Sequence, residues 1–157
     1  MSVAGPAILL VVAAVVAFLL RKRLVVVALF SLASLVTAIA IVASTPADAT
    51  SELLGLPLRL SPLGRLAAMV LLAILGALVL DVWLDEPAYN FFPTALGVGA
   101  AVVAVMVLVT PLAIYTALLA GLLLPVGSFT FQIHRNRSVE AASRHYGFVT
   151  LGGTLGL

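Results

Sequence analysis

The sequence predicts an all-α fold, a polytopic bundle of about six transmembrane helices whose amino terminus lies outside the membrane. Three observations lead to this prediction. Hydrophobic residues make up 64% of the 157 residues and charged residues only 9%, whereas a soluble domain carries about a quarter charged residues. Apolar runs recur at roughly the 20 residues that a helix needs to cross a bilayer. Most of the charged residues lie between these runs, where loops outside the membrane are expected.

The first two predicted spans form a helical hairpin at 3–20 and 24–43. Only the basic turn Arg21, Lys22 and Arg23 separates the two apolar runs. A secretory signal peptide carries its positive charge before the apolar run, whereas here the charge follows the run. We therefore expect the first run to be retained as a membrane span.

The connection at 45–65 differs in composition from its neighbours. Pro46, Pro57 and Pro62 are expected to break a helix there. Within it, "LPLRLSP" alternates apolar and polar residues, which indicates a short strand or an interfacial segment. The third span is predicted at 66–84, and Trp83 followed by the acidic residues 85–86 marks its interfacial end.

The region from 91 to 131 is almost uninterrupted in its apolar character. It is roughly twice the length of one span, so we expect two helices at 91–109 and 111–131. Thr110-Pro111 is the natural break, because a residue before proline avoids the helical region. Gly97 and Gly99 would allow close helix packing in the fourth span. A sixth run at 139–157 ends the sequence, and residues 1–157 are interpreted as one membrane domain, the amino-terminal fragment of a longer subunit.

Basic residues are unevenly divided between the two sides that alternating spans define. One side holds six of the eight, namely Arg21, Lys22, Arg23, Arg135, Arg137 and Arg144, and the other side holds Arg59 and Arg65. The positive-inside rule places the six in the cytoplasm. This predicts a multi-pass protein of the cell inner (plasma) membrane, with residues 21–23 and His134, Arg135 and Arg137 as topogenic loops. The orientation depends on a true turn at Thr110-Pro111.

Four residues are candidates for a proton path. Asp81 lies inside the apolar register of the third span, where a carboxylate is either functional or close enough to the interface to reach water. Glu140 and Arg144 have the i, i+4 spacing that pairs charges on one helix face, and His145 titrates near neutral pH. The same cluster also fits a capped helix start, with Ser138 as the N-cap residue and an acid in the first turn.

Several chemistries have no residue pattern to support them. The chain has no cysteine, which excludes disulfides, thiolate metal sites and cysteine nucleophiles. Its two histidines form no metal-ligand spacing and no Ser-His-acid set. Its basic residues form no solvated patch of the kind that binds nucleic acid. We therefore predict no catalytic residue, no metal, no cofactor and no nucleic-acid partner.

Three segments resemble one family of membrane proteins. They are "LPLRLSPLGRLAAMVLLAILGALVLDVW", "EPAYNFFPTALGVGAAVVAVMVLVTPLAIYTALLAGLLLPVGSF" and "RSVEAASRHYGFVTLGG". They are similar to the third to sixth spans of antiporter-like proton-translocating subunits, found in respiratory complex I (NADH:quinone oxidoreductase) and multisubunit Na+/H+ antiporters. The resemblance implies a membrane subunit of a redox-linked proton- or sodium-translocating complex, with other membrane subunits as partners and the redox chemistry elsewhere.

One departure from that family concerns the fifth span. The family carries a glutamate there, ahead of a proline, as a central member of its proton path. Counted back from Pro125, this chain has Leu119 or Ala120 at that place, and no acid occurs from 91 to 131. The departure predicts a non-pumping or structural version of the subunit, at most a translocase subunit without catalytic residues of its own. The alternatives are a small stand-alone multispan protein, such as a transporter half or an assembly factor, and, with least support, a membrane enzyme.

Overall fold

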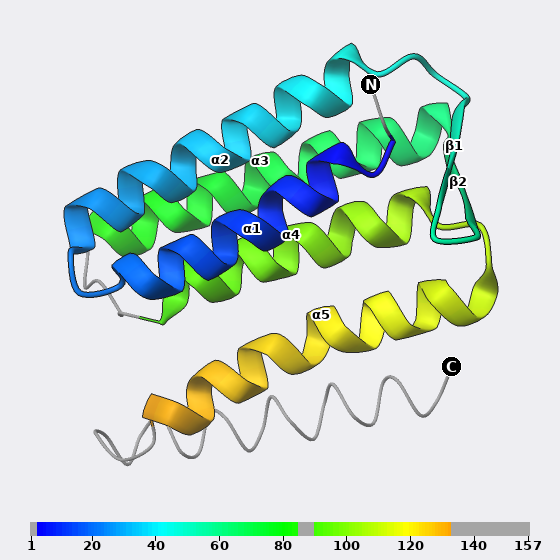
Figure 1. Cartoon of the computed structure of the whole chain (residues 1–157). Helices are drawn as coiled ribbons and strands as arrows, with labels where there is room; N and C mark the ends of the chain where they lie inside the picture. The colour runs from blue at the N-terminus through cyan, green and yellow to red at the C-terminus, as the bar shows by residue number, and fades with distance from the viewer. Residues whose placement is uncertain (1–2, 85–89, 133–157) are drawn as a thin grey trace.

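The computed structural model describes residues 3–84 and 90–132. This part of the chain is mostly helical, as the sequence predicts, and it also contains a small β-hairpin (Figure 1). The elements in chain order are α1 (Gly5–Leu20), α2 (Leu24–Ser44), β1 (Ala49–Leu53), β2 (Leu56–Leu60), α3 (Pro62–Leu84), α4 (Phe91–Val107) and α5 (Pro111–Gln132).

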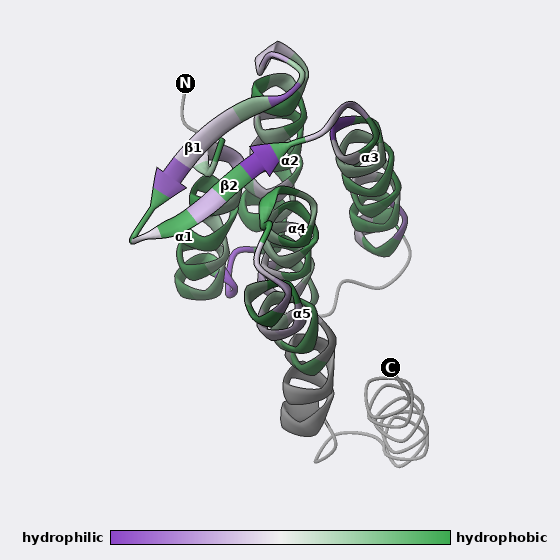
Figure 2. Cartoon of the chain, turned by 90° about the vertical axis from the view of Figure 1, so that its right-hand side faces the viewer, coloured by the Kyte–Doolittle hydropathy of each residue, from purple (hydrophilic) through white to green (hydrophobic). Residues whose placement is uncertain are grey.

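The five helices of the described part lie side by side, and each runs opposite in direction to the next one along the chain (Figure 1). Helix α4 is central, because it packs against α1, α2, α3 and α5. The α1–α2 turn and the start of α4 lie at one end of the bundle, and the β-hairpin lies at the other (Figures 1 and 2).

The core of the bundle is built around the side chains of α4 that face the neighbouring helices. Phe92, Leu96 and Val103 are almost fully buried, and Ala95 and Ala100 lie between them. Small residues at such positions let helix backbones approach closely, which is how membrane helices gain packing contacts. The expectation that the small residues of the fourth span serve packing is in keeping with this arrangement.

The third helix begins earlier than its predicted start at residue 66. It starts at Pro62, because proline fits the first turn of a helix, where its missing N–H has no helical partner. The Ser61 hydroxyl accepts a hydrogen bond of 3.0 Å from the Gly64 backbone N–H and so caps this turn. No helix crosses Pro62, as predicted, but the helix that follows begins at this proline and not at residue 66.

The predicted break at Thr110-Pro111 is confirmed. Helix α4 ends at Val107, two residues before its predicted end, where the Leu108 N–H donates to the Ala104 carbonyl and the backbone becomes extended. Helix α5 starts at Pro111 and continues to Gln132. The chain therefore reverses direction between α4 and α5, as the predicted orientation requires.

The β-hairpin corrects the all-α prediction. Strands β1 and β2 pair antiparallel, with Ala49 opposite Leu60 and Leu53 opposite Leu56. The "LPLRL" segment is a strand, which was one of its two predicted interpretations. Strand β1, "ATSEL", was not predicted, because alanine, serine and glutamate have little intrinsic preference for strands.

Two helices of the described part, α2 and α3, have both the length and the apolar composition to cross a membrane. Helices α1 and α4 are apolar but shorter, at 16 and 17 residues. Helix α5 has 22 residues. The run at 139–157 lies outside the described residues, so the described part of the chain does not establish the six predicted spans.

Candidate functional site

The basic turn Arg21 to Arg23 connects α1 to α2 at one end of the bundle. The Arg21 guanidinium lies over the Phe18 ring, 4.3 Å from its centroid, in cation–π geometry. The Arg21 Nη1 also donates to the Asn90 Oδ1 at 3.4 Å, a long hydrogen bond that reaches the residue before α4. Lys22 and Arg23 are exposed. Arg21 therefore links the two connections at this end, and its neighbours face outward.

Of the proton-path candidates, the described residues include only Asp81. It is exposed and lies in the last turn of α3, where it makes no hydrogen bond or ion pair with the described part of the chain. Glu140, Arg144 and His145 lie outside the described residues. So do the acidic residues 85–86 and the predicted topogenic residues His134, Arg135 and Arg137.

Helix α2 contains the polar residues nearest to the middle of a predicted span. Three hydroxyls each donate to the carbonyl four residues earlier: Ser31 to Val27 at 2.7 Å, Ser34 to Phe30 at 2.8 Å and Thr37 to Ala33 at 2.7 Å. Such bonds satisfy a hydroxyl within its own helix. These side chains are therefore satisfied locally and form no connected polar path between helices.

Helix α5 corresponds to the fifth predicted span, in which the sequence resemblance led us to look for a central glutamate. Leu119 and Ala120, the candidate positions, are both exposed. The polar residues Tyr115 and Thr116 are also exposed, and the Thr116 hydroxyl donates to the Ala113 carbonyl at 2.9 Å. Apart from Tyr115 and Thr116, the exposed described side chains of α5 are apolar, and none of the described side chains of α5 is acidic.

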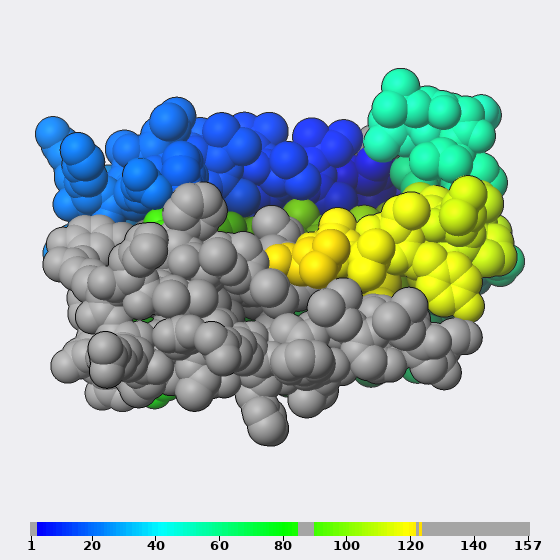
Figure 3. Space-filling view, turned by 90° about the horizontal axis from the view of Figure 1, so that it is seen from below, coloured from blue at the N-terminus to red at the C-terminus, as the bar shows by residue number. Residues whose placement is uncertain are grey.

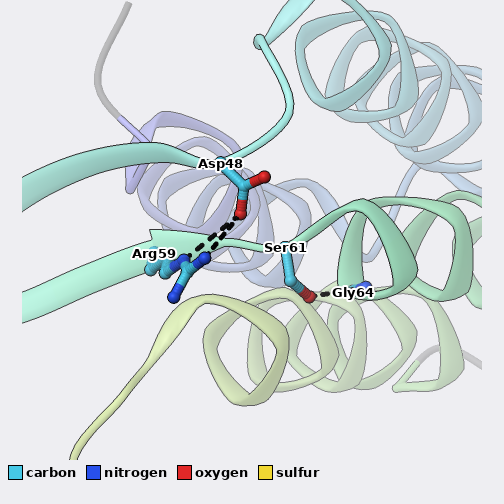
Figure 4. Close-up of polar contacts among 4 residues, drawn as sticks. All are labelled: Asp48, Arg59, Ser61 and Gly64. Carbon is cyan, nitrogen blue, oxygen red and sulfur yellow. Dashed lines mark hydrogen bonds and ion pairs between the residues drawn. The ribbon is translucent and has the colours of Figure 1, made fainter.

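The hairpin end of the bundle holds the described ion pair, which joins Asp48 to Arg59 (Figure 4). Both the Nε and the Nη2 of Arg59 donate to the Asp48 Oδ1, at 3.2 and 2.9 Å. The two side chains are 60% and 52% exposed, so water screens their attraction. The pair holds the base of the hairpin together, and its charges remain available to solvent.

A second contact at this end joins two helices. The Arg65 Nη1, in the first turn of α3, donates to the Thr45 carbonyl at 3.2 Å, at the end of α2. A cation at a helix carboxyl terminus also interacts favourably with the helix dipole. Thr45 is 1% exposed, so this hydrogen bond satisfies a buried carbonyl. Arg65 therefore links the start of α3 to the end of α2 through a hydrogen bond.

Within residues 3–84 and 90–132, no three His, Asp or Glu side chains come together as they would to hold a metal ion. The described charges lie at the two ends of the bundle, and its long sides are apolar (Figure 2). No family model, no curated protein and no solved structure matches the chain. Function must therefore be argued from the distribution of apolar and polar residues.

Sequence reasoning did not anticipate the hairpin or the contacts that hold its base. One signal was available, because Leu54-Gly55 lies between two segments of five residues that can pair as strands. A glycine at the second turn position is typical of two-residue hairpins. The Arg65 contact had no signal in the sequence, because its partner is a backbone carbonyl 20 residues away.

Proposed function

We propose that this chain is a multispan membrane protein and a non-pumping subunit of a redox-linked proton- or sodium-translocating complex. The observation that carries the membrane part is the exposure of α3. Its most apolar stretch of 18 residues is only 17% buried within the protein. An apolar helix in the core of a soluble protein would be covered by its neighbours.

The outer face of α3 explains why water is the wrong solvent for it. Large apolar side chains are exposed along its whole length: Leu63, Leu66, Val70, Leu71, Ile74, Leu78, Leu80 and Leu84. Contiguous apolar patches of this kind are rare on soluble monomers. Lipid chains accommodate them without cost, and this supports a bilayer around α3.

The position of α4 extends the argument to the shorter helices. Since α4 packs against both α2 and α3, a bilayer that encloses those two helices also encloses α4. Helices α1 and α5 pack on α4 in turn and run antiparallel to it. This supports five spans in the described part, and the proposed sixth, at 139–157, completes the predicted bundle.

The charged ends support the proposed orientation. Arg21, Lys22 and Arg23 lie together at one end. The other end has two arginines, Arg59, which is paired with Asp48, and Arg65, which lies near the Thr45 carbonyl. By the positive-inside rule the first end is cytoplasmic, so the amino terminus and the hairpin lie outside. The membrane is proposed to be the cell inner membrane.

The non-pumping part of the proposal rests on the polar groups of the bundle. A proton path needs titratable side chains in sequence across the membrane. The hydroxyls of α2 are bonded within their own helix, and the described part of α5 has no acid. Asp81 lies at the end of α3. This arrangement supports a packing role, with ion translocation performed by partner subunits.

The choice of complex rests on the resemblance of the sequence to antiporter-like subunits. The test is affinity purification of the chain from its native membrane in mild detergent. We expect other membrane subunits and redox subunits to co-purify. Recovery of the chain alone, or only as a homo-oligomer, would contradict the complex and favour the stand-alone multispan protein.

A second experiment tests the non-pumping role separately. The purified chain is reconstituted into vesicles that contain a pH-sensitive dye, and a potassium gradient with valinomycin supplies the driving force. We expect the proton flux to equal that of protein-free vesicles. A flux well above this background, abolished by Asp81→Asn, would contradict the packing role and place a proton path in this chain.

A further inference from the structure

The tip of the hairpin is an exposed apolar group at one end of the bundle. Leu54 is 96% exposed, and Leu53 and Leu56, on either side of the turn, are each 39% exposed. Single exposed leucines are common on protein surfaces. Three exposed leucines around one two-residue turn, one of them almost fully exposed, require a separate explanation.

The backbone at the tip adds a second unfavourable feature. Leu54 has a φ of 51° and Gly55 a φ of 79°. Positive φ at both central residues is the signature of a type I′ turn, which favours Asn-Gly or Gly-Gly. Glycine adopts this conformation freely, but a bulky side chain is strained there. Leu54 is thus both strained and solvent-exposed, and packing in the described protein compensates for neither feature.

The orientation of the hairpin determines what the tip can reach. The hairpin lies across the end of the bundle, and its tip extends past α1 (Figure 2). In the view from below, the hairpin projects beside the amino-terminal half of α1 (Figure 3). The ion pair between Asp48 and Arg59 lies at the opposite, basal end of the strands. The hairpin therefore has an ion pair at its base over the bundle, an exposed Glu52 one residue before Leu53, and a tip of three leucines beyond the edge of the bundle.

The exposed surface of α1 indicates what the hairpin tip contacts. Its exposed side chains include Ile8, Val11, Val12 and Val15, which are 48–58% exposed. They repeat at the helical spacing of one face. If the bundle is surrounded by lipid, as the proposed function states, acyl chains cover this face of α1, and the hairpin tip extends past the same helix (Figure 2).

We propose that the hairpin tip inserts into the lipid interface beside α1 and anchors this end of the bundle at the membrane surface. This inference rests on the proposed membrane location. A bilayer fits the tip better than a protein partner, because stable protein interfaces bury roughly 800 Å² on each side. A turn with three leucines offers only a small part of that area, whereas each aliphatic side chain can enter the interface independently.

The experiment uses spin labels on single-cysteine variants of the full chain, which has no cysteine of its own. Leu54→Cys places the label at the tip. Thr50→Cys is the matched control, because Thr50 is exposed near the base of the same hairpin. Val12→Cys reports on the outer face of α1. The variants are reconstituted in phosphatidylcholine vesicles, and collision with oxygen is compared with collision with a water-soluble nickel complex.

We expect the label at residue 54 to collide preferentially with oxygen and the label at residue 50 with nickel. If residue 54 is as accessible to nickel as residue 50 while residue 12 is protected, lipid anchoring is wrong and the membrane location stands. If residue 12 is also accessible to nickel, the proposed membrane location fails as well.

A second variant, Leu54→Asn, suits the turn and removes the anchor. In a protein labelled at Leu53→Cys, we expect Leu54→Asn to increase the collision of the label with nickel by several-fold. An unchanged collision rate would contradict anchoring by Leu54.

Discussion

Gly121 of α5 lies so close to Ala101 of α4 that a Cβ atom placed on the glycine would be 2.8 Å from the alanine Cβ. Real Cβ atoms do not approach this closely, and an alanine Cβ cannot rotate away. The contact therefore sets the distance between these two helices, one of which is the centre of the bundle. In a membrane, where lipid removes the hydrophobic driving force between helices, close packing through small residues is one source of helix association.

The first prediction concerns this contact. We expect Gly121→Ala to push α5 away from α4 and to destabilise the fold by about 1–3 kcal/mol, the usual cost of overpacking. The measurement is unfolding by sodium dodecyl sulfate in mixed micelles, followed by circular dichroism. Ala101→Gly should restore much of the stability of the Gly121→Ala protein, because it removes the opposing Cβ.

A matched control for this prediction is Gly76→Ala in α3. A Cβ on Gly76 would meet no other atom within 4 Å, so the substitution adds only helix propensity. We expect Gly76→Ala to leave stability unchanged or to raise it by up to about 1 kcal/mol. Equal losses in the two glycine variants would show that the short distance to Ala101 has no structural consequence.

The second prediction concerns Gly99, which faces three leucines. A Cβ there would lie 3.1 Å from a Cδ atom of Leu75, 3.3 Å from one of Leu72 and 3.5 Å from one of Leu10. These atoms are the ends of flexible side chains, which can shift by a few tenths of an ångström. We expect Gly99→Ala to cost less than Gly121→Ala, about 1 kcal/mol or less. Gly99→Leu should cost more than either in the same unfolding assay, and its tolerance would contradict the close packing.

The third prediction compares two arginines at the hairpin end. Arg65→Met removes the donor to the buried Thr45 carbonyl, so we expect a loss of about 1 kcal/mol. Arg59→Met removes an ion pair that is largely exposed, so its cost should be about 0.5 kcal/mol or less and should decrease with added salt. Unfolding at low and high salt separates the two effects. A larger loss for Arg59 than for Arg65 would contradict this ranking.

A break between two helices could be predicted from the sequence where a single residue, such as proline, restricts the backbone at that position. Thr110-Pro111 is such a case, because proline restricts the residue before it. Pro62 shows the limit of such a rule. Proline can follow the end of one element or occupy the first turn of a helix. At this position the Ser61 hydroxyl caps the first turn, so a helix starts at Pro62.

Contacts between distant segments could not be predicted in this way. Strand β1 exists because β2 pairs with it, and β-propensity depends strongly on such context. The Arg65 contact depends on how α2 and α3 pack. For the candidate site, the sequence located the basic turn, but the bond from Arg21 to Asn90 spans 69 residues and only the fold brings the two together.

The fourth prediction tests the orientation of the bundle. The variants are Lys22→Cys in the basic turn and Ala47→Cys near the base of the hairpin, both at exposed positions. We expect a membrane-impermeant maleimide added to intact cells to label residue 47 only, because the positive-inside rule places the basic turn in the cytoplasm. Permeabilised cells serve as the control, since both residues should then react. Labelling of residue 22 alone in intact cells would reverse the orientation.

The fifth prediction concerns Glu140 and Arg144, which the sequence spaces as an i, i+4 pair. If the chain is a packing subunit, we expect the pair to carry no protons, and an ion pair at this spacing contributes about 0.3–0.5 kcal/mol where a helix forms. We expect Glu140→Gln to leave the proton-to-electron ratio of the proposed complex unchanged, with a small loss of thermal stability. The exchange variant, Glu140→Arg with Arg144→Glu, keeps an ion pair and should recover part of that stability. A normally assembled Glu140→Gln complex with a reduced ratio would place Glu140 on a proton path, because only a titratable group at that position is lost.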